Sequence, residues 1–409
     1  MTLLLAVMSG VFARLVGQQA VESELVAAAV AARGDSPHSA TVTGTMTHAW
    51  LITGPPGSGR SVAALCFAAA LQCTSDGVPG CGECRACTTT MAGTHADVRR
   101  IVPEGLSIAV KEMREIVQIA SRRPGTGRWQ IVVIEDADRL TEGAANALLK
   151  VVEEPPASTV FLLCAPSVDP EDIAITLRSR CRHVALTTPS VDAIADVLIS
   201  GDGLPAEDAR WAASVCGGHV GRARRLATDP EARERRRRAL GLARDAATPS
   251  RAYAAAEEMV AVAEAEAVAL TAGRNEAETE ELKTALGAGG TGKGTAGTTR
   301  GTAGALKELE KRQKSRQTRA SRDALDRALI DLATYFRDAL LVSSGATAVT
   351  ANHPDMAEKI EALAAHAPAD RLLRCIEAVL DCREALAMNV KPKFAVDAMV
   401  ATVGQALRG

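Results

Sequence analysis

Apolar residues follow two different patterns along this chain of 409 residues. Up to about residue 188, short continuous apolar runs alternate with segments of helical periodicity; the runs are 50–53, 130–134 and 159–164. Such runs are typical of parallel strands, which helices cover on both faces. After residue 188, every periodic segment has helical spacing. The pattern predicts an α/β domain followed by helical parts.

The same pattern suggests where these parts begin and end. We expect the α/β domain over 11–188, a small helical lid domain over 189–230 and a helical C-terminal domain over 231–409. A stretch rich in glycine, threonine and alanine at about 286–304 predicts a flexible insertion. Within it, 287–294 imitates a phosphate loop, but no strand precedes it and glycine stands where Ser or Thr is needed.

Composition and charge exclude several classes of protein. The formal net charge of −2 excludes a polycation, so any contact with nucleic acid is local or shared with partners. The basic run 235–238 invites a DNA-binding interpretation, but Glu231 and Glu234 favour a solvated helix face. The apolar segment 1–8 lacks a basic region and a cleavage site, so we expect a mis-assigned start rather than a signal peptide. No stretch approaches the ~20 apolar residues of a membrane span, and we expect a cytoplasmic protein.

A phosphate-loop motif follows the first predicted strand and opens a helix. Three glycines allow backbone amides to cradle an anion at the helix N-terminus: Gly54, Gly57 and Gly59. Ser61 completes the GxxxxGx[ST] frame, but Arg60 replaces the lysine that reaches the β- and γ-phosphates. A planar guanidinium is not equivalent to a compact ammonium. The motif predicts the fold of a phosphate loop, whose site is either empty or binds nucleotide weakly.

Two acidic residues after the second run bear on ATP hydrolysis. An ATPase needs an Asp that holds Mg²⁺ and then a Glu that polarises water, whereas Glu135 precedes Asp136 here. The shorter Asp136 side chain lies one methylene short of the water that a Glu would reach. Together with Arg60, this order predicts negligible ATP turnover by the isolated chain.

Two arginines outside the loop are candidates for contact with phosphate. Arg180 ends a short predicted helix in the triplet 179–181, Ser-Arg-Cys, beyond the core of the nucleotide-binding fold. From there it reaches a neighbour's nucleotide more easily than its own, and such an arginine finger raises rates by ~10³–10⁵. The alternative is an ordinary surface arginine. Arg222, in the Gly-Arg-Ala run of a helix start, either lies over a phosphate or belongs to a basic first turn, and the sequence leaves both open.

Four of the ten cysteines lie close together in the sequence. Their spacing, with glycine and proline between them, is that of metal ligands: Cys73, Cys81, Cys84 and Cys87. Four thiolates suit a tetrahedral structural Zn²⁺. An iron–sulfur cluster is the rival, but no other feature indicates redox work. The remaining cysteines are scattered, which favours a reducing compartment.

These motifs together resemble the AAA+ family, and within it the bacterial clamp-loader subunits of DNA polymerase III. The resemblance rests on the phosphate loop, the four-cysteine module and four further segments, which are 11–18, 146–156, 177–181 and 389–395. It implies a P-loop AAA+ domain with an inserted zinc module, a helical lid and an all-α collar for oligomerisation. Because a motor subunit of that family would carry Lys at position 60 and Asp-Glu at 135–136, the departures here resemble a stator-type subunit.

The resemblance also implies partners and a role. A stator caps one end of a hetero-pentameric arc with gamma/tau and delta subunits and supplies Arg180 in trans to a neighbouring subunit's ATP. The complex acts on a sliding clamp and primed DNA during replication. An ATP-hydrolysing motor subunit is the alternative within the family. A small-molecule P-loop kinase is a third hypothesis, but it has no use for the Ser-Arg-Cys triplet, the cysteine module or the long helical part.

Overall fold

The computed structural model describes residues 10–34, 46–286, 299–346 and 348–408. The chain divides into two compact units, residues 1–224 and 225–409. Among the described helices, none is long and apolar enough to cross a membrane.

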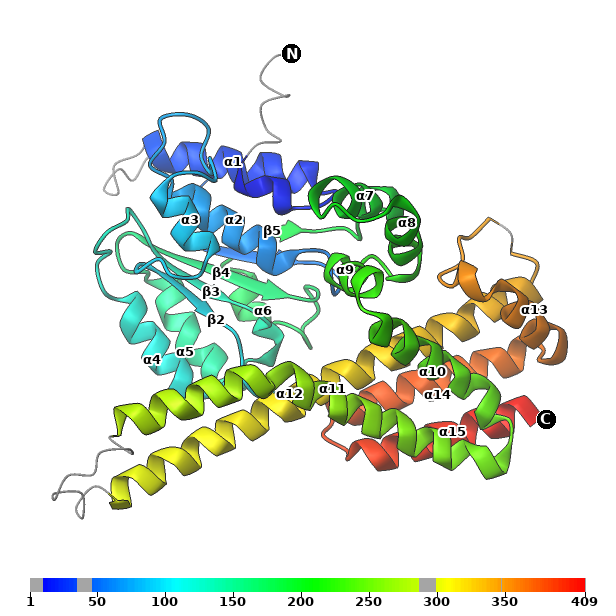
Figure 1. The fold of residues 1–409 in the computed structure, drawn as a ribbon. Helices are drawn as coiled ribbons and strands as arrows, with labels where there is room; N and C mark the ends of the chain where they lie inside the picture. The colour runs from blue at the N-terminus through cyan, green and yellow to red at the C-terminus, as the bar shows by residue number, and fades with distance from the viewer. Residues whose placement is uncertain (1–9, 35–45, 287–298, 347, 409) are drawn as a thin grey trace. The chain divides into compact units, whose positions relative to one another are not determined.

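A parallel five-stranded sheet forms the centre of the first unit, in the order β2-β3-β4-β1-β5 (Figure 1). The strands are β1 (Ala49–Thr53), β2 (Val98–Ile101), β3 (Gln130–Ile134), β4 (Thr159–Ala165) and β5 (Arg182–Ala185). The three apolar runs become the central strands β3, β4 and β1, every residue of which is buried. The sequence pattern did not predict β2 and β5, because edge strands are only partly covered and lack a continuous apolar run. The α/β core is as expected.

Helices cover both faces of this sheet. Trp50 and Ile52 of β1 pack toward one set of helices, which are α1 (Gln19–Gly34), α2 (Arg60–Gln72) and α3 (Arg85–Met91). Leu51, between them in sequence, packs toward the other set, which are α4 (Val110–Ala120), α5 (Glu142–Glu153) and α6 (Ile175–Arg178). Successive side chains of a strand point to opposite faces. The sheet therefore separates two apolar cores.

The chain is helical after β5. Three helices follow in order, which are α7 (Val191–Asp196), α8 (Ala206–Val215) and α9 (Val220–Thr228). The first two helices of the second unit, α10 (Pro230–Ala246) and α11 (Pro249–Ala285), each begin with a proline. Proline is favoured at this position because the amide it lacks would have no partner there. The remaining helices are α12 (Thr299–Ser343), α13 (Ala357–His366), α14 (Ala369–Ala387) and α15 (Pro392–Arg408).

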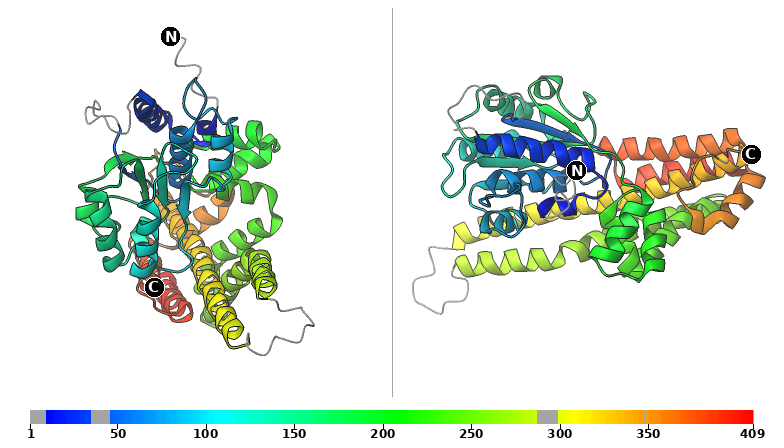
Figure 2. Two further views of the ribbon diagram at one scale, coloured as in Figure 1. Left: turned by 90° about the vertical axis from the view of Figure 1, so that its left-hand side faces the viewer. Right: turned by 90° about the horizontal axis from the view of Figure 1, so that it is seen from above.

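Helices α11 and α12 are the longest of the described helices and lie side by side as an antiparallel pair (Figures 1 and 2). Residues 299–304 are the first turns of α12, so the expected flexible insertion of 286–304 is wrong at this end. Extending an existing helix is easier than starting one, which lets α12 include Gly301 and Gly304. The phosphate-loop imitation at 287–294 lies outside the described residues.

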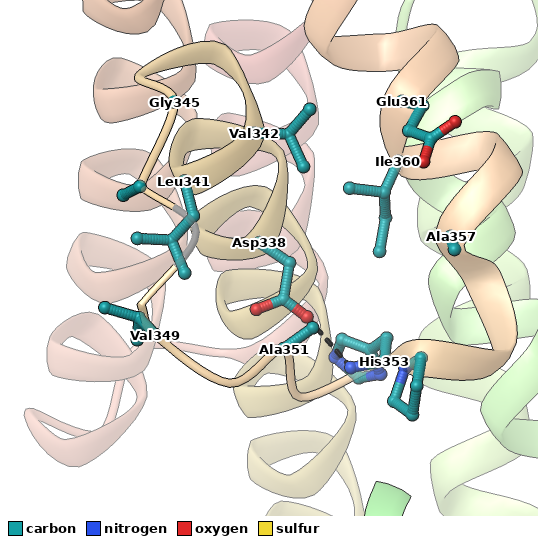
Figure 3. A pocket seen from close by; sticks show the side chains of 12 residues that line it. Asp338, Leu341, Val342, Gly345, Val349, Ala351, His353, Ala357, Ile360 and Glu361 are labelled. Carbon is teal, nitrogen blue, oxygen red and sulfur yellow. Dashed lines mark hydrogen bonds between the residues drawn. The ribbon is translucent and has the colours of Figure 1, made fainter.

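A buried polar cluster lies in the core of the second unit. Arg236 is only 5% exposed. Its guanidinium donates to both carboxylate oxygens of Asp355, at 2.7 and 3.0 Å, and contacts Nδ1 of His353 at 2.7 Å. Asp338 accepts the His353 amide at 2.8 Å (Figure 3), beside a pocket of about 350 Å³. The interpretation of 235–238 as a solvated face is therefore wrong for Arg236.

The other arginines of this run stay on the surface and pair with carboxylates of their own unit. Arg235 pairs with Asp229 at 3.0 Å. Arg237 and Arg238 both pair with Glu234 of the same helix. Arg237 and Arg238 are exposed and thus match the expectation of a solvated helix face, and Arg235 is partly buried by its ion pair.

Candidate functional site

The phosphate loop runs from the end of β1 to the start of α2. Gly54, Gly57 and Gly59 all have positive φ, at 155°, 87° and 99°. A Cβ on Gly54 would lie 2.9 Å from the carbonyl oxygen of Leu186, so glycine is required there by space as well as by backbone angle. Gly59 precedes the first residue of α2, which is Arg60. The local sequence therefore places the amides of a helix N-terminus at the carboxyl edge of the sheet.

Two polar groups of the loop have no hydrogen-bond partner among the described residues. They are Oγ of Ser58, a residue that is 2% exposed, and Nη1 of Arg60. Buried groups of this kind normally have a partner. Unpartnered donors in a loop of this geometry fit a bound anion.

Glu135, just after β3, lies beside Ser61 rather than toward solvent. Its Oε2 accepts the Ser61 hydroxyl at 2.9 Å, and its Oε1 pairs with Nε of Arg100 from β2. The carboxylate that would help to hold Mg²⁺ in an ATPase is thus paired with a guanidinium. The structure brings Ser61 and Glu135 together as predicted and adds Arg100, which the sequence reasoning missed.

Asp136 and Asp138 continue this acidic turn. Asp136 adopts left-handed backbone angles, with φ of 51°. Burial, and then the charge of Asp136, raise the pKa of Asp138. Its Oδ1 has no hydrogen-bond partner in the described part of the chain. The turn therefore gathers three carboxylates at one edge of the sheet and neutralises the first of them with an arginine.

The first turn of α9 lies against the phosphate loop through His219. A Cβ on Gly57 would collide with the His219 ring. Nδ1 of His219 in turn accepts the backbone amide of Arg222 at 3.2 Å. Arg222 thus belongs to a helix start that covers the loop, while the two interpretations of its side chain stay open. His219, a lone histidine in a glycine-rich run, gave no signal in the sequence.

Arg180 lies near the amino ends of the strands, whereas the phosphate loop lies at their carboxyl ends. Arg182 of β5 pairs in register with Trp50 near the start of β1, whereas the loop begins after Thr53. At ~3.3 Å per residue, the start of the phosphate loop lies about 13 Å along β1 from the level of Arg182. The guanidinium is partly exposed and donates to the Thr176 carbonyl at 2.8 Å.

Arg180 also forms an ion pair that the sequence did not predict. Its Nη2 lies 2.6 Å from Oε1 of Glu153, the last residue of α5. Both side chains are about 40% exposed, at 38% and 41%, so the pair contributes little to stability. The ion pair does orient the Arg180 guanidinium toward α5. The only sequence signal for this contact was that both residues lie in segments of the clamp-loader resemblance.

The four cysteines of the module converge. Their sulfurs all lie within 4.8 Å of one another, and Sγ of Cys84 is 3.9 Å from Sγ of Cys73. Zinc–sulfur bonds of ~2.3 Å in a tetrahedron place the sulfurs ~3.8 Å apart. Backbone amides donate to two of the sulfurs, from Cys84 to Cys81 and from Cys87 to Cys84. The donor set and its spacing could hold a metal ion such as zinc.

Ionisation of these thiols differs from site to site. Burial opposes ionisation of Cys84, but hydrogen bonds from the Thr74 and Cys87 amides outweigh it and lower its pKa to about 6. Burial raises the pKa of Cys87. A bound cation would stabilise all four thiolates together. The other six cysteines are free thiols, and five of them are buried, where a cysteine packs as a small apolar residue.

Both family models that match this chain describe a subunit of DNA polymerase III. A family described as "DNA polymerase III, delta subunit" matches residues 37–190, and "DNA polymerase III, delta subunit, C terminal" matches residues 319–392. The DNA polymerase III subunit delta' of Escherichia coli is 39% identical over 145 residues, which are 35% of this chain and 43% of that protein. Parts of this chain are therefore similar to delta and delta' subunits of DNA polymerase III.

Two further subunits of DNA polymerase III are similar to this chain over comparable lengths of sequence. The delta' subunit of Bacillus subtilis is 32% identical over 160 residues, which are 39% of this chain and 48% of that protein. The tau subunit of Bacillus subtilis is 36% identical over 138 residues, which are 34% of this chain and 24% of that protein. The chain spans less than half of the length of each of these relatives. The family match over 37–190 contains the phosphate loop, the cysteine module and Arg180, but not Arg222.

Proposed function

We infer that this chain is a clamp-loader subunit of DNA polymerase III that works as a stator. It supplies Arg180 to ATP bound by a neighbouring subunit and turns over no ATP itself. The observation that carries this proposal is the placement of Arg180 at the edge of the sheet opposite its own phosphate loop. A guanidinium at that edge is available only to a nucleotide on another chain, where it would stabilise the charge of the transferring phosphate.

The chain's own site supports the second half of the proposal. Arg60 stands at the position of the catalytic lysine, and the Glu135 carboxylate is engaged by Ser61 and Arg100. An ATPase would need that carboxylate region for Mg²⁺ and for the attacking water. The unmet donors of Ser58 and Arg60 are compatible with weak binding of a nucleotide or of a simpler anion, and neither requires hydrolysis.

The rest of the chain has a place in the same proposal. A structural Zn²⁺ on the four cysteines would fix the loop between α2 and α3, which also hydrogen-bonds the N-terminal turn through the Gly80 carbonyl and the Val11 amide, 2.9 Å apart. Residues 11–188, 189–230 and 231–409 would act as AAA+ domain, lid and collar. The collar would join gamma/tau and delta subunits in a hetero-pentamer that loads the clamp on primed DNA in the cytoplasm.

The test uses the reconstituted complex with clamp and primed DNA. Arg180→Ala should leave the chain folded and assembled, and should lower ATP turnover by the share of one interface. Arg180→Lys should not rescue it fully, because an ammonium cannot make the bidentate contact. Arg178→Ala is the matched control, since the side chain of this exposed neighbour donates to the Val168 carbonyl at 3.4 Å and is paired with no carboxylate among the described residues.

Glu153 makes the test sharper. Glu153→Gln removes the charge that holds Arg180 in the free chain but leaves the finger in place. Turnover should stay at or above the wild-type rate, whereas Arg180→Ala should lower it. Wild-type turnover with Arg180→Ala, or an equal loss with Arg178→Ala, would mean that Arg180 is a surface residue without this role.

The second candidate is a motor subunit that hydrolyses ATP, which the similarity to a tau subunit favours. It predicts steady turnover by the isolated chain of about 1 s⁻¹ or more, abolished by Gly59→Val in the loop. The stator proposal predicts turnover no higher than that of the same variant. One ATPase assay on the purified chain therefore separates the two.

A further inference from the structure

A second pocket in the unit formed by residues 225–409 has no role in the function proposed above. It lies between α10 and α13 and has a volume of about 430 Å³. Its apolar side chains include Leu240, Tyr335, Leu363 and Leu407. A volume of this size is in the range of sites that bind small ligands or single large side chains.

Basic residues stand on both walls of this pocket. Arg237 and Arg244 come from α10, and Lys359 and His366 come from α13. In each pair the residues are seven positions apart, which is two turns or ~10.5 Å along a helix. None of the described residues that line the pocket is acidic. The pocket thus combines an apolar interior with the positive charges of Arg237 and Arg244 on one wall and of Lys359 on the other.

These cations are not equally engaged. Arg237 pairs with Glu234, and Arg244 pairs with Asp245 although its side chain is 79% exposed. Lys359 is exposed, and no ion pair is recorded for it in the described part of the chain. Arg244 and Lys359 are therefore the charges most available to a ligand.

Tyr335 adds a polar group to the interior. The residue is 6% exposed and lines the pocket. Its ring is held in place by Phe336 and His353, with ring centres 6.2 Å away in both cases. A tyrosine hydroxyl can donate a hydrogen bond, so Tyr335 supplies a polar group to a ligand that enters the pocket.

We propose that this pocket binds an acidic peptide segment of a partner protein, with one large apolar side chain inserted among Leu240, Tyr335 and Leu363. The spacing of the charges favours a peptide over a small molecule. Arg237 and Arg244, ~10.5 Å apart along α10, match carboxylates about three extended residues apart, and a ligand with a single carboxylate would reach only one of them. Nucleic acid fits less well, because the interior is apolar and the Tyr335 ring is buried. The proposal does not depend on the stator role.

The test is fluorescence anisotropy with the full chain and a labelled peptide, Asp-Asp-Leu-Phe-Asp-Asp. We expect saturable binding that weakens as salt is added, because exposed charges are screened. Arg244→Glu with Lys359→Glu should weaken binding at least about tenfold, and Tyr335→Phe about two- to fivefold. Lys311→Glu with Lys314→Glu is the matched control, on the exposed part of α12 outside the pocket, and should change affinity less than about twofold.

Two further measurements make the result decisive. The peptide with serine in place of Leu and Phe keeps the charge and should lose most of the affinity, and thermal melts should show that each variant is folded. Absence of saturable binding up to about 1 mM peptide would overturn the proposal. So would equal affinity for the serine peptide, an equal loss in the control variant, or binding of a fluorescent fatty acid with no competition by the peptide.

Discussion

Replacing Asp355 with alanine should destabilise the unit of residues 225–409 by about 3–5 kcal/mol, because it leaves a buried arginine without its counter-charge. The Arg236 side chain is 4% exposed and that of Asp355 is 20% exposed. Without Asp355, the guanidinium keeps His353 as its neighbour, and a neutral imidazole supplies no negative charge. The substitution also removes both charge-assisted hydrogen bonds.

Controls separate this effect from general sensitivity to substitution. Arg244→Ala changes an arginine of the same helix whose side chain is 79% exposed, and should cost less than about 0.5 kcal/mol. The double variant Arg236→Met with Asp355→Leu should be more stable than Asp355→Ala, because no unpaired charge remains buried. A double-mutant cycle then gives the coupling of the pair.

Calorimetry of the full chain provides the assay. At roughly 2–4 °C per kcal/mol for a unit of this size, the transition should move down by roughly 6–20 °C. A loss below about 1 kcal/mol for Asp355→Ala would refute the reasoning, as would strictly additive effects of the Arg236 and Asp355 substitutions.

Three other results should follow from the structure. Burial, and then the Arg236 charge, lower the pKa of His353 despite three nearby carboxylates. The stability that neutral His353 contributes is therefore complete above about pH 6.5 and falls as the pH drops through the lower pKa of the folded state. The free energy of unfolding, measured from pH 7.5 to 5, should lose this pH dependence in His353→Gln. Burial opposes ionisation of Asp97, but hydrogen bonds from the amides of residues 125–127 outweigh it and lower the pKa of Asp97 to about 2. Asp97→Asn should therefore lower the free energy of unfolding by about 2 kcal/mol in urea titrations at pH 7. The difference between the two proteins should vanish as the wild-type carboxylate is protonated toward pH 2. Cys84→Ser should abolish binding of one Zn²⁺ per chain and lower the melting temperature, and metal analysis that finds iron, or an unchanged zinc content in the variant, would contradict a four-thiolate zinc site.

The features that the sequence predicted correctly are those set by residues close together in the chain. The apolar runs 50–53, 130–134 and 159–164 predicted the three central strands, because burial on both faces leaves no polar positions. The phosphate loop and the four cysteines are also local, since their glycines and ligands must lie at fixed short spacings to do their work. The edge strands β2 and β5 escaped prediction for the complementary reason, because partial exposure leaves them without a continuous apolar run.

Only the tertiary structure decided which distant residues meet. Arg100 reaches Glu135 because β2 and β3 are neighbours in the sheet, and Arg180 reaches Glu153 because α5 and α6 lie on the same face. The burial of Arg236 required α10 to pack beside a loop more than a hundred residues further along the chain. An ion pair leaves no periodic trace in a sequence, because any of several carboxylates could have met each arginine. Packing of the helices and strands selected one of them, and with it the charge, burial and direction of each side chain.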